Sequence, residues 1–316
     1  MATSGSADYN RTASQIILGA LRVLNVLGRQ TIDSTDETNA LEALELMVKS
    51  WQAEGLHLWT QTDATLFLVP STNKYSLAGA NAANTSDVIN TTLSAAEAAS
   101  QTVISVTSST GMAAADVVGI VTDDDTTHWS TIATVDSSTQ ITIDDATDSA
   151  AASGNAVHTY TTALGRPLRI TSMRRLNSDV DVPMIELSNA EYFNLPSKKS
   201  EASPVEWYYD PQLGTGALYL WPTPDTVDDV IRFTYWRSIE DADAVSNDLD
   251  FPAEWLECLK YNLALRLAPE YGKPIAPEAA MLARELKEKL EDFDQEEASV
   301  YFSGSSDKNR FGDAHG

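Results

Sequence analysis

The stretch Asp250–Gly272 (DFPAEWLECLKYNLALRLAPEYG) most constrains what this chain can fold into. Its leucines recur at intervals of three and four residues, a spacing that places them on one face of an α-helix. Trp255 and Tyr261 widen this apolar face, which is typical of a helix at the centre of a domain. Asp250 is predicted to cap the start of the helix, and Pro269 to begin its end. Such a helix requires other apolar surfaces to cover it.

Two amphipathic segments near the N-terminus are the obvious partners. The first runs from Ile17 and is predicted to end at Gly28, a suitable C-terminal cap. The second is predicted to begin at Ser34, which with Glu37 has the spacing of a capping box. The short connection between them predicts an antiparallel hairpin. The expected core of the resulting helical bundle is Leu24, Leu44, Trp51, Leu259, Leu263 and Leu267.

After residue 60 the pattern changes to short alternating segments, which predict β-strands. These strands are expected at Ala64–Pro70, Lys74–Leu77, Pro167–Ile170, Glu206–Tyr209, Ala217–Trp221 and Val230–Trp236. A short helix is expected over Asn189–Leu195, because Ser188 can cap it. This part of the chain therefore predicts a β-sandwich-like domain.

A change of composition interrupts that domain. Residues 88–162 are rich in Ala, Ser, Thr, Val and Asp and poor in Lys and Arg. Apolar segments every ten to fifteen residues, separated by turn clusters, predict a small inserted β-barrel or sandwich module. The expected strands are Val103–Val106, Val117–Val121, Trp129–Val135 and Gln140–Ile143.

The sequence as a whole predicts an α+β protein with a helical bundle formed from both ends of the chain. Pro277 is expected to start a last helix with one apolar stripe. The polar residues after it are not expected to fold alone. The expected divisions are 1–60 for an N-terminal arm and hairpin, 61–87 and 163–245 for the β domain, 88–162 for the module, 246–300 for the remaining helices, and 301–316 for a tail.

The charge of the chain excludes one class of function. Its 46 Asp and Glu residues against 21 Lys and Arg give a net charge of −25, whereas gripping a nucleic-acid backbone requires clustered cations. The N-terminus has neither the basic start nor the apolar core of a signal peptide, and no apolar run approaches membrane-spanning length. The sequence predicts a protein made in a cytoplasm and kept there or in a particle assembled there, with no membrane partner.

No catalytic motif survives inspection, so we predict no enzyme, no cofactor and no catalytic or metal-binding residue. The four histidines are far apart, and the sequence has no phosphate-binding glycine loop or nucleophile elbow. Asp123–Asp125 and Asp144-Asp145 have oxygen ligands that suit a hard cation, but solvated turns are the favoured interpretation. The single cysteine, Cys258, is interpreted as a packed side chain rather than a nucleophile.

The second half of the β domain is rich in aromatic residues: Tyr208, Tyr219, Trp221, Tyr235 and Trp236. Packing in a sandwich core and across strands is the favoured interpretation. A stacking platform for carbohydrate is the alternative.

Three stretches carry a resemblance to a known family. They are Asn262-Leu263 with Arg266–Tyr271 (RLAPEY), Ala20–Gly28 with Ala40–Gly55, and Trp207–Pro224 (WYYDPQLGTGALYLWPTP). In order and spacing they resemble the head-to-tail adaptor, or connector, proteins of short-tailed bacteriophages. These are also called packaged-DNA stabilisation proteins or tail tubular proteins A.

The resemblance implies a structural virion protein at the head–tail junction. In that family a ring of subunits, typically twelve, docks beneath the portal protein and extends the DNA channel. The ring retains the packaged genome and receives a downstream tail or nozzle protein, while DNA passes without sequence-specific binding. An acidic chain suits such a conduit, because charge repulsion keeps DNA sliding. C-terminal tails in this family lie along the portal, which implies a docking role for Tyr301, Phe302 and Phe311.

Two other functions remain open from the sequence. The module over 88–162 is not part of the minimal adaptor, so the chain is alternatively a carbohydrate-binding virion protein that acts through this module. The second alternative is a cell-wall hydrolase. Its acid pair cannot be assigned, because carboxylates are abundant everywhere.

Overall fold

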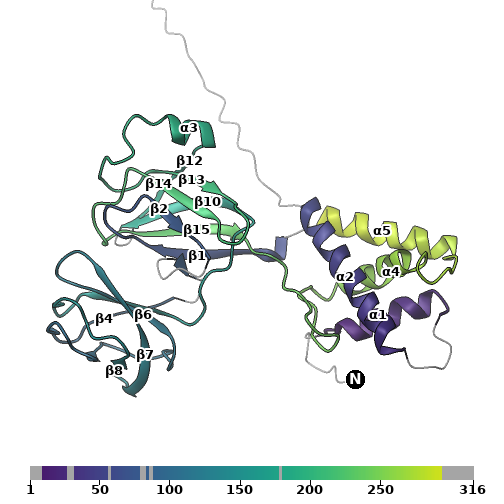
Figure 1. Ribbon diagram of the computed structural model, residues 1–316, viewed down its shortest axis with the longest axis horizontal. Helices are drawn as coiled ribbons and strands as arrows, with labels where there is room; N and C mark the ends of the chain where they lie inside the picture. The colour runs from purple at the N-terminus through teal and green to yellow at the C-terminus, as the bar shows by residue number, and fades with distance from the viewer. Residues whose placement is uncertain are drawn as a thin grey trace, which may run out of the picture. The chain divides into compact units, whose positions relative to one another are not determined.

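The structure is a computed structural model that describes residues 9–26, 32–55, 58–78, 83–84, 88–177 and 180–293. Helices and three separate β-sheets are both present, so the predicted α+β class is confirmed (Figure 1). The chain divides into two compact units. Unit 1 comprises Met1–Met47 and Ala242–Gly316, and unit 2 comprises Val48–Asp241, so the boundary falls inside the second helix.

In unit 1, helix α1 covers Ala13–Val23. Thr12 caps it, since its hydroxyl accepts a hydrogen bond from the backbone N–H of Gln15 at 3.4 Å. The N–H groups of Ala13 and Ser14, in the first turn, have no partner within the helix. They donate to the carbonyls of Asn247 and Val245 at 2.9 and 2.8 Å. These bonds join the start of α1 to the loop that precedes helix α4.

The predicted end of α1 at Gly28 is wrong, because the helix ends five residues earlier, at Val23. Asn25 adopts a positive φ of 57° and takes the position at which helices commonly place glycine. The N–H groups of Asn25 and Val26 donate to the carbonyls of Arg22 and Leu21, which satisfies the last turn. Gly28 itself lies outside the described residues.

Helix α2 covers Ser34–Glu54. The predicted capping box is wrong, because Ser34 is the first helical residue and the side chain of Asp33 accepts the N–H of Ser34 at 2.8 Å. The carboxylate of Glu37 instead accepts the hydroxyl hydrogen of Ser14 at 2.6 Å. Glu37 therefore joins α2 to α1 rather than capping its own helix.

Helices α4 (Trp255–Leu267) and α5 (Pro277–Phe293) complete unit 1. The predicted start of α4 at Asp250 is wrong, because Pro252 and Ala253 form a separate turn whose carbonyls accept the N–H groups of Trp255 and Leu256. Helix α5 begins at Pro277 as predicted. The side-chain amide of Asn262 on α4 donates to the carbonyl of Ala283 on α5 at 3.1 Å, which ties the two helices together.

All six residues predicted to form the bundle core are buried: Leu24, Leu44, Trp51, Leu259, Leu263 and Leu267. Helix α4 packs against α1 and α5, which brings segments from both ends of the chain into unit 1. Trp51, however, belongs to unit 2. The single bundle with one shared core therefore stays a prediction.

Unit 2 contains two sheets that share a hydrophobic core. The first has the strand order β11-β10-β15-β1-β3 and the second β12-β13-β14-β2. Residues from both sheets, including Leu66, Phe233, Trp207 and Leu218, belong to the same buried cluster. The strands of the first sheet are β1 Gln61–Phe67, β3 Ala83–Asn84, β10 Arg169–Asn177, β11 Val180–Pro183 and β15 Val230–Trp236. The strands of the second sheet are β2 Lys74–Ser76, β12 Ile185–Glu186, β13 Glu206–Asp210 and β14 Ala217–Trp221.

A third sheet of unit 2 falls within residues 88–162 and has its own buried cluster, which includes Val118, Ile120 and Ile141. Its order is β4-β9-β6-β7-β8-β5. The strands are β4 Ile89–Thr92, β5 Val103–Ser105, β6 Val117–Val121, β7 Thr127–Ser137, β8 Gln140–Ile143 and β9 Ala156–Tyr160. A short 3₁₀ helix (η1, Leu58–Thr60) precedes β1. Helix α3 (Asn189–Asn194) lies between β12 and β13 in the sequence and has the capping box of Ser188 and Glu191.

Candidate interaction groove

The carboxylates in the acidic turns of the third sheet accept hydrogen bonds from side chains of the same region. The carboxylate of Asp124 accepts hydrogen bonds from Thr122, Thr126 and Ser149 at 2.6–2.8 Å, and these bonds, that of Thr122 first, lower the pKa of Asp124. Asp144 accepts from Thr131, and Asp123 from Asn155. Within the described residues, no group of three or more His, Cys, Asp or Glu side chains is placed to hold a metal ion. Hydrogen bonds from neighbouring side chains therefore satisfy these carboxylates.

Cys258 is buried on α4, and burial raises the pKa of its thiol to about 12. The amide of Asn262 donates to its sulfur at 3.3 Å. A thiol with so high a pKa carries almost no thiolate at neutral pH, which is the form a nucleophile needs. The packing interpretation of Cys258 is therefore the one that the structure supports.

The aromatic residues of the second sheet pack against helix α3 rather than forming an open platform. Tyr208 and Tyr219 lie opposite each other on β13 and β14, with 5.6 Å between ring centroids. The ring of Tyr192 on α3 lies 5.1 Å from that of Tyr219. Tyr235 is in the core instead, and the indole of Trp221 donates to the carbonyl of Ser197. These contacts favour the packing interpretation over a carbohydrate platform.

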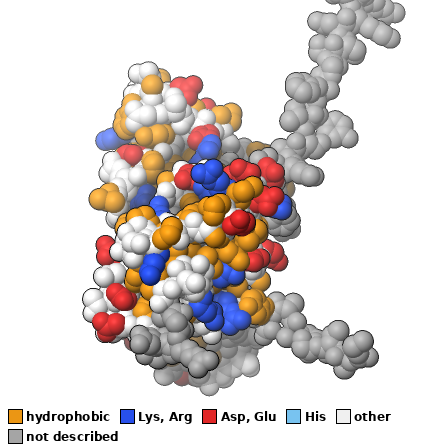
Figure 2. All heavy atoms as spheres, turned by 90° about the vertical axis from the view of Figure 1, so that its right-hand side faces the viewer, with side chains coloured by type: hydrophobic (Ala, Val, Ile, Leu, Met, Phe, Trp, Pro, Cys, Tyr) orange, Lys and Arg blue, Asp and Glu red, His pale blue; other side chains and the backbone are white. Residues whose placement is uncertain are grey.

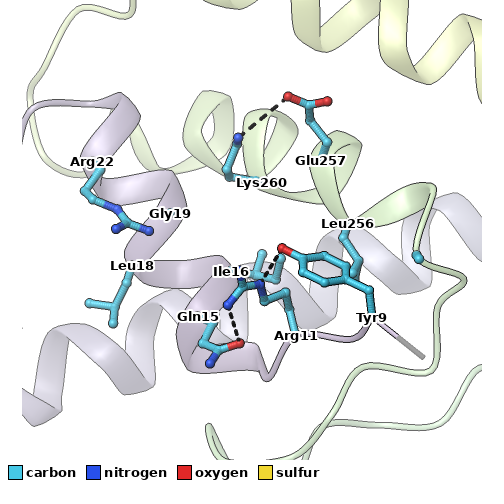
Figure 3. A pocket seen from close by; sticks show the side chains of 11 residues that line it. Tyr9, Arg11, Gln15, Ile16, Leu18, Gly19, Arg22, Leu256, Glu257 and Lys260 are labelled. Carbon is cyan, nitrogen blue, oxygen red and sulfur yellow. Dashed lines mark hydrogen bonds and ion pairs between the residues drawn. The ribbon is translucent and has the colours of Figure 1, made fainter. Parts of the chain in front are cut away.

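The strongest candidate for a binding site is a groove in unit 1 between α1 and α4, with a volume of about 640 Å³ (Figure 3). Its lining contains Tyr9, Arg11, Gln15, Ile16, Leu18, Gly19, Arg22, Ala253, Leu256, Glu257 and Lys260. Ile16 and Leu256 are buried and form an apolar floor. The polar side chains stand along the sides, as Figure 3 shows.

The close approach of α1 and α4 forms this groove, and Gly19 permits it. A β-carbon at Gly19 would lie only 3.0 Å from Cγ of Lys260, so the aliphatic part of Lys260 occupies the space that a larger side chain would need. The Lys260 ammonium then lies 4.3 Å from the centre of the Tyr261 ring and 3.8 Å from the carboxylate of Glu257. Glycine at this position therefore leaves the space that the aliphatic part of Lys260 occupies.

The opposite side of the groove is ordered by Arg11. Its Nε donates to the hydroxyl of Tyr9 at 2.7 Å, and its Nη1 donates to Oε1 of Gln15 at 3.3 Å. Because Thr12 and the loop carbonyls fix the start of α1, Arg11 is held at the edge of the groove. Arg22, also on α1, is exposed, and its guanidinium makes no hydrogen bond or ion pair with any residue that the structure describes.

The sequence did not single out this groove. Three of its residues carry positive charge: Arg11 and Arg22 come from the start and end of the α1 region, and Lys260 comes from α4, far along the chain. The signal available in the sequence was Gly19 within an otherwise regular helical pattern, which points to close packing. The sequence could not show that Lys260 would lie opposite it. The predicted tail residues Tyr301, Phe302 and Phe311 lie outside the described residues.

A comparison with protein-family models places the chain in a known class. The model that matches is described as SU10 adaptor protein, and the match spans residues 111–306. The class is that of structural adaptor proteins of bacteriophages. Because the matched range covers more than half of the 316 residues, this chain belongs to the SU10 adaptor protein family.

The matched range begins inside the third sheet and continues through the second half of unit 2 into α4 and α5. It does not include α1 and α2. Among the curated proteins, none matches this sequence. In the part of the chain that the structure describes, no helix has the length and apolar character needed to cross a membrane.

Proposed function

We propose that this protein is a ring-forming head-to-tail adaptor in the virion of a short-tailed phage. The ring docks beneath the portal protein, extends the DNA channel and retains the packaged genome. It also provides the attachment site for a downstream tail or nozzle protein. Subunits assemble in the host cytoplasm into a ring, which we expect to contain twelve copies.

The observation that carries this proposal is the family match over residues 111–306. It coincides with two of the stretches in which the sequence resembles head-to-tail adaptors, those of β13–β14 and α4. The net charge of −25 supports a channel role, because a surface that repels DNA allows it to pass. The same charge opposes association of free copies, so we expect the isolated chain to be largely monomeric.

The test is assembly on the portal protein of the same phage. We expect the monomeric chain to form rings when portal is added, seen by electron microscopy and by co-sedimentation with portal. Raised salt should ease assembly, since it screens repulsion between copies. A chain that neither binds portal nor forms rings over a range of salt would contradict the proposal.

The tail residues Tyr301, Phe302 and Phe311 are proposed as anchors on the portal, because aromatic side chains contribute much of the binding energy at interfaces. Truncation after Val300 should leave the circular dichroism spectrum of the folded part unchanged and weaken co-sedimentation with portal. Alanine at the three aromatic positions should have the same effect. Alanine at Ser303, Ser305 and Ser306 is the matched control. Unchanged portal binding by the truncated chain would contradict the anchoring role.

A further inference from the structure

The groove between α1 and α4 reverses the charge balance of the chain. Over the whole sequence acidic residues outnumber Lys and Arg by more than two to one, 46 against 21. In the lining of the groove, Arg11, Arg22 and Lys260 stand against one acid, Glu257. Figure 2 shows one face of the molecule, on which blue Lys and Arg side chains gather beside an area of hydrophobic side chains. A ligand of this groove should therefore be acidic.

The shape and chemistry of the groove fit a peptide segment. Its floor is apolar at Ile16 and Leu256, while the charges stand along its edges. A volume of about 640 Å³ accommodates a few residues of an extended chain rather than a globular domain. Arg11 is already held by Tyr9 and Gln15, so part of the site is ordered before anything binds. Such a site matches an acidic segment that also carries an apolar side chain.

The chain itself contains such a segment. Residues 291–297 read EDFDQEE, with five carboxylates, no basic residue and one aromatic residue, Phe293. The first three of these residues are the last of α5, which ends at Phe293, and residues 294–297 follow the helix. No other stretch of seven residues in the sequence carries as many acids.

We propose that the groove of one copy binds residues 291–297 of a second copy of this chain. Arg22 and Lys260 contact the carboxylates of Asp294, Glu296 and Glu297, while Phe293 faces the apolar floor. Each copy carries both the groove and the acidic segment, so the contact repeats from copy to copy in one direction, as a ring requires. The proposal rests on the proposed ring and names the surfaces that join neighbouring copies.

The proposed contact brings opposite charges of two acidic copies together. Two copies at −25 each repel, and a contact between opposite charges offsets part of that repulsion locally. The groove supplies such a place without making the chain basic elsewhere. The acidic segment ends before the aromatic residues proposed to anchor on the portal, so the two contacts use different parts of the C-terminal region.

The first test is carbodiimide crosslinking, which joins a lysine amine to a carboxylate in contact with it. Unlabelled and nitrogen-15-labelled full-length chains are mixed, with and without portal protein, and the crosslinked peptides are read by mass spectrometry. We expect Lys260 to link to Asp294, Glu296 or Glu297 in peptide pairs of mixed isotope composition. The link between Lys260 and Glu257 within one chain, 3.8 Å apart, is the internal control.

Links from Lys260 to the acidic segment in pairs of one isotope only would show that each chain binds its own segment, and would overturn the proposal. Links from Lys260 to portal would overturn it as well. Rings on portal with no link between Lys260 and residues 291–297 would overturn this inference while leaving the adaptor function intact. Cross-copy links without any portal binding would contradict the adaptor function and leave this inference intact.

The second test exchanges the charges. Arg22→Glu with Lys260→Glu makes the groove acidic. Glu296→Lys with Glu297→Lys reverses two of the three carboxylates proposed to contact the groove, so that positions 294, 296 and 297 together carry a net positive charge. Each of these double substitutions by itself should reduce the yield of cross-copy association about tenfold, because like charges then meet. A mixture of the two variants should restore it, since each acidic segment then finds a basic groove and each basic segment an acidic one.

Arg266→Glu with Lys273→Glu is the matched control, because both residues are exposed in unit 1 outside the groove and the charge change is the same. This control should associate like the unmodified chain. Lys260→Met with Arg22→Met keeps the aliphatic packing on Gly19 and removes the charges, which guards against a folding defect. No rescue in the mixture, or equal loss in the control, would overturn the proposal.

Discussion

The imidazole of His158 stacks on the ring of Phe67, with 4.3 Å between ring centroids and 29° between ring planes. Phe67 is the last residue of β1 in the first sheet, and His158 lies on β9 in the third sheet. Nδ1 of His158 and Oδ1 of Asn90, its neighbour on β4, are 2.7 Å apart and share a hydrogen bond. This stack joins the sheet inserted at residues 88–162 to the rest of unit 2.

The stack predicts a dependence of stability on pH. Burial lowers the pKa of His158 from 6.5 to about 4. The unfolded chain therefore takes up this proton at a higher pH than the folded chain, and the free energy of unfolding falls as pH drops from 6.5 to about 4. The loss is at most about 3 kcal/mol, and less to the extent that water reaches the ring.

His158→Gln should remove this contribution, so its free energy of unfolding should fall less steeply than that of the unmodified chain between pH 6.5 and 5. Urea titrations at several pH values measure the two slopes. Parallel slopes would show that His158 binds protons alike in both states.

Gly119 is predicted to be required next to Trp129. These residues lie opposite each other on β6 and β7, and a β-carbon at Gly119 would lie 2.6 Å from Cζ3 of the Trp129 ring. Gly119→Ala should therefore lower the free energy of unfolding by about 1–3 kcal/mol, the usual cost of overpacking. Gly165→Ala is the control, because its β-carbon meets no described atom within 4 Å, and thermal unfolding compares the two.

Replacing residues 88–162 by a short Gly/Ser linker should leave the remaining chain folded. The third sheet has its own buried cluster, and the other two sheets share a different one. Phe67, now 4% exposed, would lose its partners His158 and Trp129. A second variant should therefore also carry Phe67→Ser. Circular dichroism should show unchanged helical content and cooperative melting, whereas an insoluble or molten product would place the module within the main core.

Leu263→Ala is predicted to cost about 2–5 kcal/mol of unfolding free energy, the range for emptying a buried leucine site. Leu263 on α4 is fully buried. Leu46→Ala on α2 is the control, since Leu46 is 59% exposed and its truncation should change stability by less than about 0.5 kcal/mol. Equal losses for the two variants in denaturant titrations would remove α4 from the core.

The strands with clear alternation could be predicted from the sequence. Gln140–Ile143, Ala217–Trp221 and Val230–Trp236 have the predicted bounds. In the last of these the burial alternates residue by residue, which is the pattern that the sequence reveals. Strand β12 has two residues, too few to carry such a pattern, and it forms by pairing with β13, which lies further along the chain.

Helix ends were harder to predict than helices. Local signals favoured Gly28 and Asp250, yet the structure ends α1 with Asn25 and begins α4 at Trp255. In both places the backbone closes a short turn, with hydrogen bonds between residues three to five apart, where the sequence predicted continuous helix. The groove could not be predicted from the sequence, since it depends on Gly19 and Lys260 meeting across two helices.

Unit 1 is assembled from the two ends of the chain, and this has a consequence for synthesis on the ribosome. Helix α1 emerges early, but its partner α4 emerges only after all of unit 2 has been translated. At ~5–20 residues per second, the chain between α1 and α4 takes roughly 12–46 s to make. Throughout that interval the apolar side of α1, with Ile16, Ile17 and Leu21, has no α4 to cover it. The nascent chain therefore exposes an apolar surface that chaperones can bind until α4 has been translated.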